Sequence, residues 1–511
     1  MTLRDLLRSI DADWAREALS GVPGERLSAV VSGIAYDSRR VSPGELFVGV
    51  RGLVHDGAKY AAAAAARGAV AVVSETDPGG LPVPSIRVAQ SRNALASLSA
   101  AFYGHPSREM TVVGITGTNG KTTTAWLLGS ALEACGIRAG ILGTVLYRIG
   151  GEEREAARTT PEAPDIQRML REMVQAGCSA CAMEVSSHAL VLDRVAAVRF
   201  SAGVFTNLTR DHLDFHGDME GYFRAKLRLF ESLDAGGAAV VNLDDPRGLS
   251  ILPVVAGSTI TYAIDHDADV KPGPIEFSLD GLAFTARTPA GPIDVRTRLV
   301  GRPNAYNLLA TVASGVALGL PLDGVARGLA AVEGVPGRFQ VVSGSGDDVS
   351  VVVDYAHTDD ALRNLLETAR PLARRRLITV FGCGGDRDRT KRPLMGAVAS
   401  RLSDLVIVTS DNPRTEDPAA IIAEIRRGIP IEDRNGKHRK VMEVVDRRTA
   451  IERAINLAEP GDVVLLAGKG HEKYQVIGDK VLPFDDAAVA RAALAVRREA
   501  FETRGDRDHR W

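Results

Sequence analysis

Residues 114–124 of the chain read GITGTNGKTTT. This stretch follows the apolar run 110–113 and precedes apolar residues at helical spacing, which are Ala125, Leu127, Leu128, Ala131 and Leu132. A buried strand, a glycine-rich loop and a helix in this order are typical of a phosphate-binding loop. The stretch therefore predicts an α/β fold with a nucleotide site at the start of a helix.

The loop carries the groups that a nucleotide and Mg²⁺ require. Backbone N–H groups and the positive end of the following helix can surround polyphosphate oxygens, and glycine lets the backbone approach them closely. Lys121 can reach the terminal phosphates, and the Thr122 hydroxyl can ligate Mg²⁺. We therefore expect ATP to bind the loop residues Gly117, Thr118, Asn119, Gly120, Lys121, Thr122 and Thr123.

The loop departs from the common P-loop at one position. The common pattern has a glycine five residues before Gly120, and this chain has Ile115 there. The sequence thus indicates a P-loop of a restricted kind. The alternative interpretation is a glycine-rich turn with a solvated lysine.

Composition narrows the class of protein. The 511 residues suggest about three domains. A formal net charge of -2 gives no reason to expect a nucleic-acid partner or an anionic membrane surface. The N-terminal residues lack the continuous apolar core of a signal peptide, and no later stretch approaches a membrane span. We expect a cytoplasmic monomer without membrane insertion.

Cysteine usage fits a reducing compartment, because four cysteines in so long a chain do not make a disulfide framework. Cys178 and Cys181 are spaced as CxxC, whereas Cys135 and Cys383 stand alone. We interpret the CxxC pair as buried thiols at a helix-to-strand junction. A zinc or redox role is the alternative.

Two linker-like stretches divide the chain. HPSRE at residues 105–109 and GVPGRF at residues 334–339 predict domains over residues 1–108, 109–337 and 338–511. From Met110 onward, strand-like and helical patterns alternate, which implies a mostly parallel sheet covered on both faces. The middle domain is therefore expected to be a parallel-sheet P-loop ATPase domain.

The third domain carries a second series of strands and polar loops. Its apolar runs lead into DYAHT, GCGGDRDRTKRP, SDNPRTEDP and GKGHEKY. In an open parallel sheet, ligands bind at the carboxyl ends of the strands, where all of these loops would lie. The pattern favours a Rossmann-like domain with a second binding site, and ordinary charged surface loops are the alternative.

Acidic and imidazole side chains gather at strand ends in the middle domain. Glu184 ends an apolar strand, as a metal-linked carboxylate in a P-loop protein should, and His212 and Lys226 follow the next strand. Mg²⁺ prefers oxygen ligands, so Thr122 and Glu184 are natural candidates and a histidine is less usual. Taken alone, His212 would be a solvated or hydrogen-bonded loop residue. Beside the P-loop, we favour a metal ligand.

Several motifs together resemble one known family. GITGTNGKTTT, AMEVSSHAL, FTNLTRDHLDFHG, GRPNAYNLLA, DYAHT and GCGGDRDRTKRPLMG, in this order and at these spacings, are similar to the Mur ligase family of peptidoglycan precursor synthesis. The resemblance covers nearly the whole chain and ends about two dozen residues before the last one. It implies a three-domain enzyme that couples ATP cleavage to amide formation through an acyl phosphate.

The resemblance also implies roles for individual residues. The family pattern puts the metal at Thr122, Glu184, His212 and Lys226, with Lys226 carbamylated, and it makes Lys121, Lys226 and His212 the catalytic residues. It puts Asn304 and Asn307 near the adenine, and Arg338 and Asp354 against the nucleotide from the third domain. The muramyl peptide would bind residues 1–108 and the middle domain, at Ser38 and His55 for uridine and at Thr159, Thr160, Ser186 and Arg194 for the sugar and peptide. Leu192 replaces a glutamine that is often found in the family.

The DNPR stretch is the sharpest signal for the added amino acid. Arg414 offers a planar fork that can bind a carboxylate through two hydrogen bonds, and in the family DNPR marks members that add diaminopimelate. Diaminopimelate differs from lysine by a carboxylate beside its distal amine. The resemblance thus implies UDP-N-acetylmuramoyl-L-Ala-D-Glu and meso-diaminopimelate as substrates, the latter bound by Arg387, Asp411, Asn412, Pro413, Arg414, Gly468 and Glu472.

Two other functions compete with this one. A folylpolyglutamate synthase shares the restricted P-loop and the acyl-phosphate chemistry, but should lack the first domain with YDSRR and the DNPR loop. A P-loop switch or motor would use ATP to change partners rather than to make a bond, and it would need no paired substrate loops in a third domain.

Overall fold

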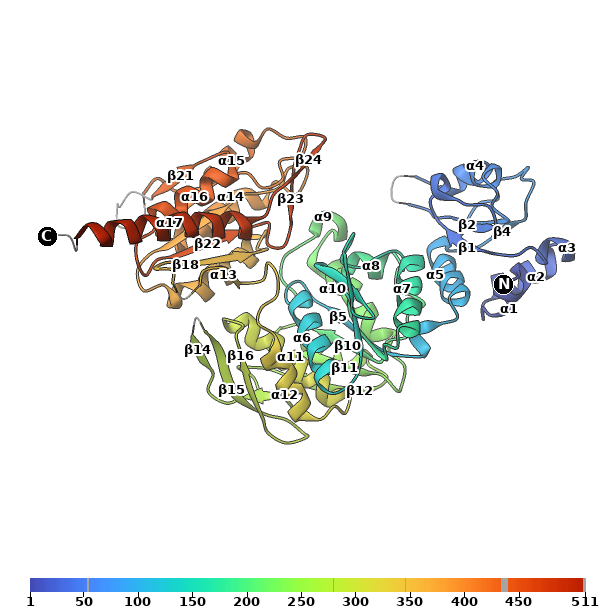
Figure 1. Ribbon diagram of the computed structural model, residues 1–511. Helices are drawn as coiled ribbons and strands as arrows, with labels where there is room; N and C mark the ends of the chain where they lie inside the picture. Colours follow the sequence, from blue (N-terminus) through green and yellow to red (C-terminus); the bar gives the residue numbers. More distant parts are fainter. Residues whose placement is uncertain (53–54, 279, 345, 433–439, 509–511) are drawn as a thin grey trace.

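The computed structural model describes residues 1–52, 55–278, 280–344, 346–432 and 440–508 of the chain. Three sheet-containing regions follow one another from the N-terminus to the C-terminal side of the molecule (Figure 1). Within the described residues, no helix is long and apolar enough to cross a membrane. The division at residues 108/109 and 337/338 stays a prediction.

The first region is a small parallel sheet with helices around it. The strands pair in the order β1-β2-β3-β4 and all run parallel. They are β1 (Gly33–Ala35), β2 (Glu45–Gly49), β3 (Ala71–Ser74) and β4 (Ser85–Arg87). The helices are α1 (Leu3–Arg8), α2 (Asp13–Gly21), α3 (Gly24–Leu27), α4 (Ala61–Ala66) and α5 (Ser91–Phe102). The HPSRE stretch contains the short η3 helix (Pro106–Arg108).

The central sheet has eight strands in the order β12-β11-β10-β5-β9-β6-β7-β8. Its strands from β12 to β6 pair in parallel, and β7 and β8 continue it as antiparallel strands. They are β5 (Thr111–Thr116), β6 (Ala139–Leu142), β7 (Leu146–Ile149), β8 (Glu152–Glu155), β9 (Ala180–Glu184), β10 (Ala202–Phe205), β11 (Ala238–Asn242) and β12 (Ser258–Tyr262). The predicted parallel P-loop sheet is therefore confirmed.

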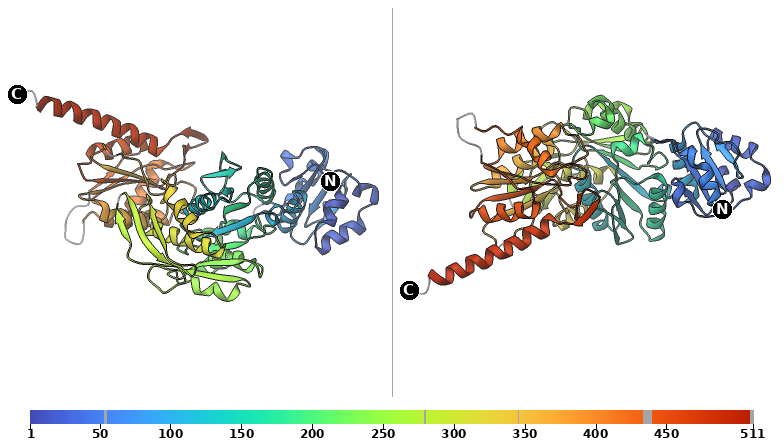
Figure 2. Two further views of the ribbon diagram at one scale, coloured as in Figure 1. Left: turned by 60° about the horizontal axis from the view of Figure 1, so that its bottom comes forward. Right: turned by 90° about the horizontal axis from the view of Figure 1, so that it is seen from above.

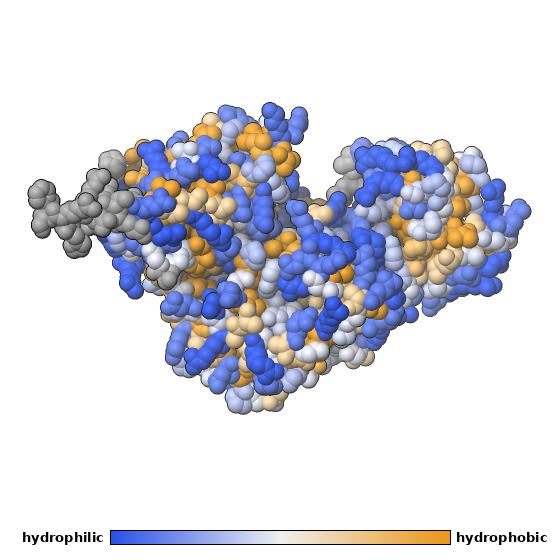
Figure 3. All heavy atoms as spheres, viewed as in Figure 1, coloured by the Kyte–Doolittle hydropathy of each residue, from blue (hydrophilic) through white to orange (hydrophobic). Residues whose placement is uncertain are grey.

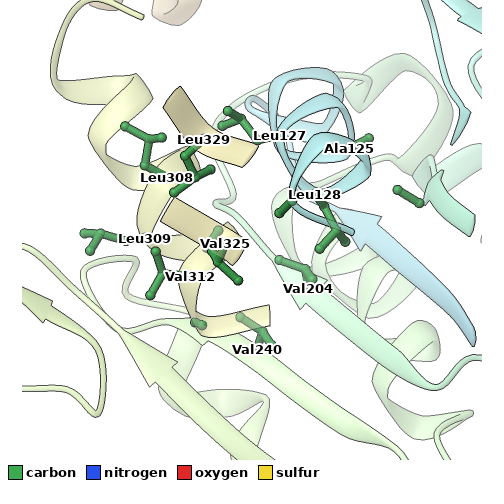
Figure 4. Packing of buried hydrophobic residues seen from close by; sticks show 14 of the residues in the cluster. Ala125, Leu127, Leu128, Val204, Val240, Leu308, Leu309, Val312, Val325 and Leu329 are labelled. Atoms are coloured by element: carbon green, nitrogen blue, oxygen red, sulfur yellow. The ribbon is translucent and has the colours of Figure 1, made fainter. Parts of the chain in front are cut away.

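Helices cover both faces of this sheet, as the sequence predicted. They are α6 (Lys121–Ala134), α7 (Ala163–Gln175), α8 (Ser187–Val191), α9 (Leu213–His216), α10 (Met219–Glu231), α11 (Arg302–Ala317) and α12 (Leu322–Ala331). Strand β9 shows the two faces directly, because Ala180 and Ala182 belong to one buried cluster and Cys181 and Met183 to the other. On the first face, Leu128 of α6 packs with residues of α11 and α12 (Figure 4).

The CxxC pair lies in this core. Cys178 and Cys181 are free thiols with 4% and 0% exposure. Cys178 stands between α7 and β9, and burial raises the pKa of Cys181. Within the described residues, no three His, Cys, Asp or Glu side chains converge on a possible metal position. These observations favour buried thiols over a zinc site.

A small antiparallel sheet between β12 and α11 was not predicted from the sequence. It contains β13 (Lys271–Pro272), β14 (Glu276–Ser278), β15 (Gly281–Arg287) and β16 (Ile293–Thr297). Alternate residues Leu282, Phe284 and Ala286 of β15 join the core of the central domain. Since the other side of β15 is more exposed, the sheet covers one side of this core.

The C-terminal sheet follows the order β17-β18-β22-β19-β20-β21, with all pairs parallel except β17 with β18. Its strands are β17 (Gln340–Val341), β18 (Ser350–Asp354), β19 (Leu377–Phe381), β20 (Leu405–Val408), β21 (Val441–Glu443) and β22 (Val463–Ala467). Helices lie on both faces (Figure 2), namely α13 (Asp359–Ala369), α14 (Lys391–Leu402), α15 (Pro418–Arg426), α16 (Arg447–Leu457) and α17 (Asp486–Asp508). This is the expected Rossmann-like arrangement.

A buried ion pair ties α16 to α17 beneath two strand ends. Arg447 and Asp486 are both fully buried, and the Arg447 Nη2 atom lies 2.6 Å from the Asp486 Oδ2 atom. The same guanidinium donates to the carbonyl oxygens of Ser410 and Ala467 at 3.3 and 3.0 Å. These are the residues directly before Asp411 and Gly468. The pair therefore fixes the starts of two of the predicted substrate loops.

Candidate functional site

The predicted phosphate-binding loop connects β5 to α6, as the sequence indicated. Gly117 has φ +152° and Gly120 has φ +87°, which are conformations that favour glycine. A Cβ atom at Gly117 would lie 1.9 Å from the Thr206 Oγ1 atom. Ile115 lies within β5 and is fully buried in the core. The position that departs from the common P-loop is thus a strand residue here, and its side chain is used for packing.

The segment after β10 holds the loop through its backbone. The Thr118 N–H donates to the Asn207 carbonyl oxygen at 2.9 Å, and the Asn119 N–H donates to the Asn207 side-chain oxygen at 2.9 Å. The Thr206 hydroxyl donates to the Asn119 carbonyl oxygen at 2.6 Å. Thr206 and Asn207 were not among the predicted site residues, although they lie within the quoted FTNLT motif.

The two functional side chains at the start of α6 lie in different environments. The Lys121 ammonium donates to the carbonyl oxygens of Gly117 and Thr118 at 2.9 and 2.8 Å, and burial lowers its pKa. The Thr122 hydroxyl donates to the Glu184 Oε2 atom at 3.0 Å. Thr123 is buried behind them at 4% exposure. The structure therefore brings Thr122 and Glu184 into direct contact.

Glu184 ends β9 and is only 1% exposed. Its Oε1 atom accepts from the Thr144 N–H at 2.7 Å, and its Oε2 atom accepts from the Thr144 hydroxyl at 3.0 Å. Thr144 was missed from the sequence, where it is one of many threonines that no motif marks. The carboxylate and the two hydroxyls form a set of hard oxygen donors, and this is the chemistry that Mg²⁺ prefers.

His212 and Lys226 both lie near Tyr222, and neither is hydrogen-bonded to Glu184 among the described residues. The His212 ring lies 6.2 Å from the Tyr222 ring, and the Lys226 Nζ atom lies 4.4 Å from the centre of that ring. Burial lowers the pKa of His212 to about 4. No hydrogen bond among the described residues joins His212 to Thr122 or Glu184. The predicted metal ligands thus form two adjacent pairs.

Lys226 is almost completely buried, at 1% exposure. Its ammonium donates to the Gly117 carbonyl oxygen at 2.8 Å, so it contacts the phosphate-binding loop itself. Burial and then the nearby Lys121 charge lower its pKa well below the usual value. The alternative interpretation, an unmodified surface lysine, does not fit this position.

The predicted adenine residues, Asn304 and Asn307, belong to α11, which lies beside the phosphate-binding loop. The Asn307 side-chain amide donates to the Asn304 Oδ1 atom at 3.0 Å, and the Asn304 amide donates to the Val300 carbonyl oxygen at 2.9 Å. A Cβ atom at Gly120 would lie 2.4 Å from the Asn307 Oδ1 atom. Both asparagines are therefore held beside the second glycine of the loop.

Two contacts bring the C-terminal domain to this loop. The Arg338 Nη2 atom donates to the Thr122 hydroxyl at 3.1 Å, and the Asn119 amide donates to the Asp360 Oδ2 atom at 3.4 Å. Arg338 also lies 4.7 Å from the centre of the Tyr355 ring. Asp354 accepts from the Phe339 and Ala356 N–H groups, and burial raises its pKa. Asp354 thus organises the linker that carries Arg338.

The predicted sugar and peptide residues form a compact group next to Glu184. The Thr160 hydroxyl donates to the Glu184 carbonyl oxygen at 2.8 Å, and the Ser186 N–H donates to the Thr160 Oγ1 atom at 3.0 Å. The Thr144 and Thr159 hydroxyl oxygens lie 3.0 Å apart. The Arg194 Nη1 atom donates to the Thr160 carbonyl oxygen at 3.0 Å. These residues therefore lie next to Glu184, which is a predicted metal ligand.

The predicted uridine residues lie in the first domain. Ser38 begins the short η1 helix (Ser38–Arg40), and His55 is exposed. No described hydrogen bond joins either side chain to the central domain, which the first domain meets through Tyr36 and Asp165. A recess separates the first and C-terminal domains above the central one (Figure 3). A long substrate in this recess could reach both groups of residues.

The loops of the C-terminal sheet bring the two predicted carboxylate-binding arginines together. A Cβ atom at Gly384 would lie 2.9 Å from the Arg414 Nη1 atom and 3.9 Å from the Arg387 Cγ atom. Arg414 has φ +54°, and its N–H donates to the Val476 carbonyl oxygen at 3.1 Å. Val476 belongs to the hairpin of β23 (Tyr474–Ile477) and β24 (Lys480–Pro483). This hairpin supports the unusual backbone conformation of Arg414.

The remaining predicted residues of the amino-acid site lie in the DNPR and GKGHE loops. The Asn412 amide donates to the Glu472 Oε2 atom at 2.8 Å. Gly468 has φ +114°, and a Cβ atom there would lie 3.4 Å from the Asp411 Oδ2 atom. A Cβ atom at Gly385 would lie 1.9 Å from the Pro413 carbonyl oxygen. The DNPR and GKGHE loops are therefore in contact.

The fold and the loop geometry define a P-loop α/β protein whose C-terminal domain has a second parallel sheet with polar loops at its strand ends. Comparisons with known proteins extend this description. Three family models match: "Mur ligase family, catalytic domain" over residues 30–103, "Mur ligase middle domain" over residues 115–315, and "Mur ligase, glutamate ligase domain" over residues 337–470. The chain belongs to the Mur ligase family.

Relatives match over nearly the full length. The UDP-N-acetylmuramoyl-L-alanyl-D-glutamate--2,6-diaminopimelate ligase of Gloeobacter violaceus is 49% identical over 92% of this chain and 94% of its own length. The ligase of the same name from Geobacter metallireducens is 47% identical over 97% of this chain and 98% of its own length. A solved structure of such a ligase aligns with a TM-score of 0.67 and 32% identity, covering 97% of this chain and 99% of that one. These matches favour a Mur-type diaminopimelate ligase over the switch and folylpolyglutamate synthase hypotheses.

The contact of Gly117 with Thr206 predicts that Gly117→Ala weakens nucleotide binding. The added methyl group would force the loop away from the Thr206 hydroxyl, and we expect the affinity for MgATP to fall by at least about 10-fold. Isothermal titration calorimetry measures this directly. Gly136→Ala, at the end of α6, is the matched control, because Gly136 also has a positive φ of +79° but nothing lies within 4 Å of the added atom. Equal affinities for the two variants would contradict this account of the loop.

Proposed function

We propose that the protein is an ATP-dependent ligase that adds meso-diaminopimelate to the D-Glu carboxylate of UDP-N-acetylmuramoyl-L-Ala-D-Glu, in peptidoglycan precursor synthesis. The similarity to ligases of that name supports the reaction. The geometric observation that carries the amino-acid assignment is the pairing of Arg387 and Arg414 beside Gly384 at the carboxyl edge of the C-terminal sheet.

In the first step, the γ-phosphoryl group of ATP is transferred to the substrate carboxylate. A carboxylate oxygen attacks the γ-phosphorus, the bond from that phosphorus to the β-bridging oxygen breaks, and ADP leaves. The loop N–H groups and Lys121 would bind the phosphate oxygens, on which negative charge accumulates. Arg338 contacts Thr122 at 3.1 Å, so it lies where a second positive charge can act on the same phosphates.

Thr122 and Glu184 would hold Mg²⁺. Their oxygens touch at 3.0 Å, and Glu184 is fixed by Thr144, which gives the oxygen-rich set that this ion prefers. Bound Mg²⁺ would neutralise charge on the transferring phosphoryl group. His212 and Lys226 lie near Tyr222 and are proposed to complete a neighbouring metal position.

Carbamylation of Lys226 is proposed from its burial. A neutral amine is required, because the nitrogen lone pair forms the new bond to the carbon of CO₂ while the amine loses a proton. The lowered pKa of Lys226 supplies that neutral form. The product carries a carboxylate-like group, which removes a cation from beside Lys121 and provides oxygen atoms for a metal.

In the second step, the free amino group of diaminopimelate attacks the acyl phosphate. A tetrahedral intermediate forms, phosphate leaves, and the nitrogen loses a proton to give the amide. The acyl phosphate must be kept from water until the amine arrives. Contacts such as Asn119 with Asp360, at 3.4 Å, join the ATP loop to the domain that would carry the amine. Closure of this interface would align the two reactants.

We also propose a cytoplasmic, monomeric protein. ATP and a UDP-linked substrate are both found in the cytoplasm.

A direct assay tests the proposed function. Purified protein would be incubated with ATP, Mg²⁺, UDP-N-acetylmuramoyl-L-Ala-D-Glu and either meso-diaminopimelate or lysine, while ADP and the new peptide are measured. We expect ADP release that depends on both substrates and strong preference for diaminopimelate, because lysine lacks the carboxylate that Arg414 is proposed to bind. ATP hydrolysis without either substrate would favour the switch hypothesis instead.

Arg414→Ala is expected to raise the KM for diaminopimelate by about 100-fold or more, since a bidentate charged hydrogen bond would be lost. The KM for ATP should change by less than about twofold, because the nucleotide site lies on another sheet. Steady-state kinetics with each substrate varied in turn measures both values. Arg401→Ala, an exposed arginine on α14, is the control. An unchanged KM for diaminopimelate would remove Arg414 from the site.

Lys226→Ala is expected to lower kcat by at least about 100-fold, because the carbamate oxygens proposed to hold the neighbouring metal would be lost. The exposed Arg224, on the same helix, provides the control Arg224→Ala. A crystal structure of the active protein should show density for the carbamate on the Lys226 nitrogen. Activity that survives Lys226→Ala would exclude an essential role.

A further inference from the structure

Lys469 is a fully buried lysine in the GKGHE loop that has no role in the function described so far. Its exposure is 0%, and it stands between Gly468 and Gly470, just after β22. A buried ammonium is costly unless charges and hydrogen bonds compensate for it. The groups that compensate for Lys469 therefore indicate what it does.

Those groups all belong to the predicted amino-acid site. The Lys469 Nζ atom donates to the Asn412 Oδ1 atom at 3.1 Å and to the Glu472 Oε2 atom at 3.2 Å. It also lies 3.5 Å from the Asp411 Oδ1 atom. Lys469 is thus the point at which the DNPR and GKGHE loops are connected by charge.

The network around Lys469 fixes the orientation of Glu472. The Glu472 Oε2 atom accepts from both Lys469 and the Asn412 amide, the latter at 2.8 Å. The Asn412 Oδ1 atom accepts from Lys469 and, at 3.0 Å, from the Val476 N–H. Because each acceptor has two donors, the Glu472 carboxylate is held in one position before any amino acid binds.

One oxygen atom in this network has an ion-pair contact with Lys469 at 3.5 Å but no hydrogen bond within the part of the chain that the structure describes. The Asp411 Oδ1 atom is buried and has no hydrogen-bond partner among the described residues. A buried carboxylate oxygen without a donor is unusual in a folded protein. It provides an acceptor for an incoming ammonium group, beside the carboxylate that Lys469 already orients.

We propose that Lys469 is a positioning residue that sets both the geometry and the charge of the amino-acid site. It holds Asp411 and Glu472 as a pair of acceptors for the distal ammonium of the substrate. Its positive charge leaves the arginines Arg387 and Arg414 free to meet carboxylates rather than to neutralise the two acidic residues. This favours an amino acid with a second carboxylate over lysine.

The charge balance explains the direction of this preference. Without Lys469, the two acidic residues of the site would balance the two arginines. The site would then gain little from the additional negative charge of diaminopimelate compared with lysine. With Lys469, the site has an excess positive charge that matches this additional carboxylate.

Kinetics of Lys469→Gln and Lys469→Arg test this inference, which rests on the proposed function. The glutamine keeps hydrogen-bonding capacity but loses the charge, and the arginine keeps the charge. For Lys469→Gln we expect the KM for diaminopimelate to rise by about 10- to 100-fold, and the kcat/KM ratio of diaminopimelate to lysine to fall by a similar factor. The KM for ATP should stay within about twofold. Lys469→Arg should restore most of the ratio.

Lys473→Gln is the matched control, because Lys473 lies in the same loop but is exposed. Turnover of the unaltered protein with diaminopimelate is measured first, so failure of the proposed function is seen separately. A lower melting temperature with an unchanged KM and ratio would make Lys469 a purely structural residue and overturn the proposal. If Lys469→Gln does not fold, Lys469→Arg decides: a raised KM with retained preference supports the proposal, and lost preference contradicts it.

Discussion

The close approach of Gly117 to Thr206 constrains the nucleotide site. With no side chain on Gly117, the loop after β5 can lie against the strand end of β10, and Thr206 and Asn207 can bind the loop backbone on both sides of Thr118. This position in turn puts the Gly117 carbonyl oxygen within reach of Lys121 and Lys226. The placement of these two lysine side chains therefore follows from the absence of one methyl group.

The central sheet and the C-terminal sheet carry different kinds of polar side chains at their strand ends. The central sheet ends in oxygen donors around Glu184, whereas the C-terminal sheet ends in arginines beside Gly384. Parallel strands make this possible, because the carboxyl ends of neighbouring strands meet at one edge. Arg338 lies in the linker between the two sheets, and its side chain donates a hydrogen bond to the Thr122 hydroxyl. The two groups of residues thus lie on separate sheets, and the Thr122 hydroxyl is one point where the domains are in contact.

Motifs that are continuous in sequence could be predicted, and contacts that join distant segments could not. The loop between β5 and α6 and the parallel sheets follow from local periodicity and glycine placement. Thr144 could not be found, because its role depends on β6 ending next to Glu184, 40 residues later. His212 was favoured as a metal ligand from its place beside the P-loop, and Lys226 was assigned to the metal from the family resemblance. In the structure both lie near Tyr222, and their role at a metal stays a prediction. Lys469 is next to predicted residues in the sequence. It could not be singled out, because its burial is seen only in the structure.

The buried pair of Arg447 and Asp486 has an evolutionary consequence. Its guanidinium donates to the carbonyl oxygens just before Asp411 and Gly468, so the first residue of α17 helps to set the amino-acid site. Removing only one member of such a pair leaves an uncompensated charge at a cost of about 3–5 kcal/mol, whereas apolar replacement of both can be tolerated. The two positions are therefore expected to change together rather than singly, although neither residue was among the predicted site residues.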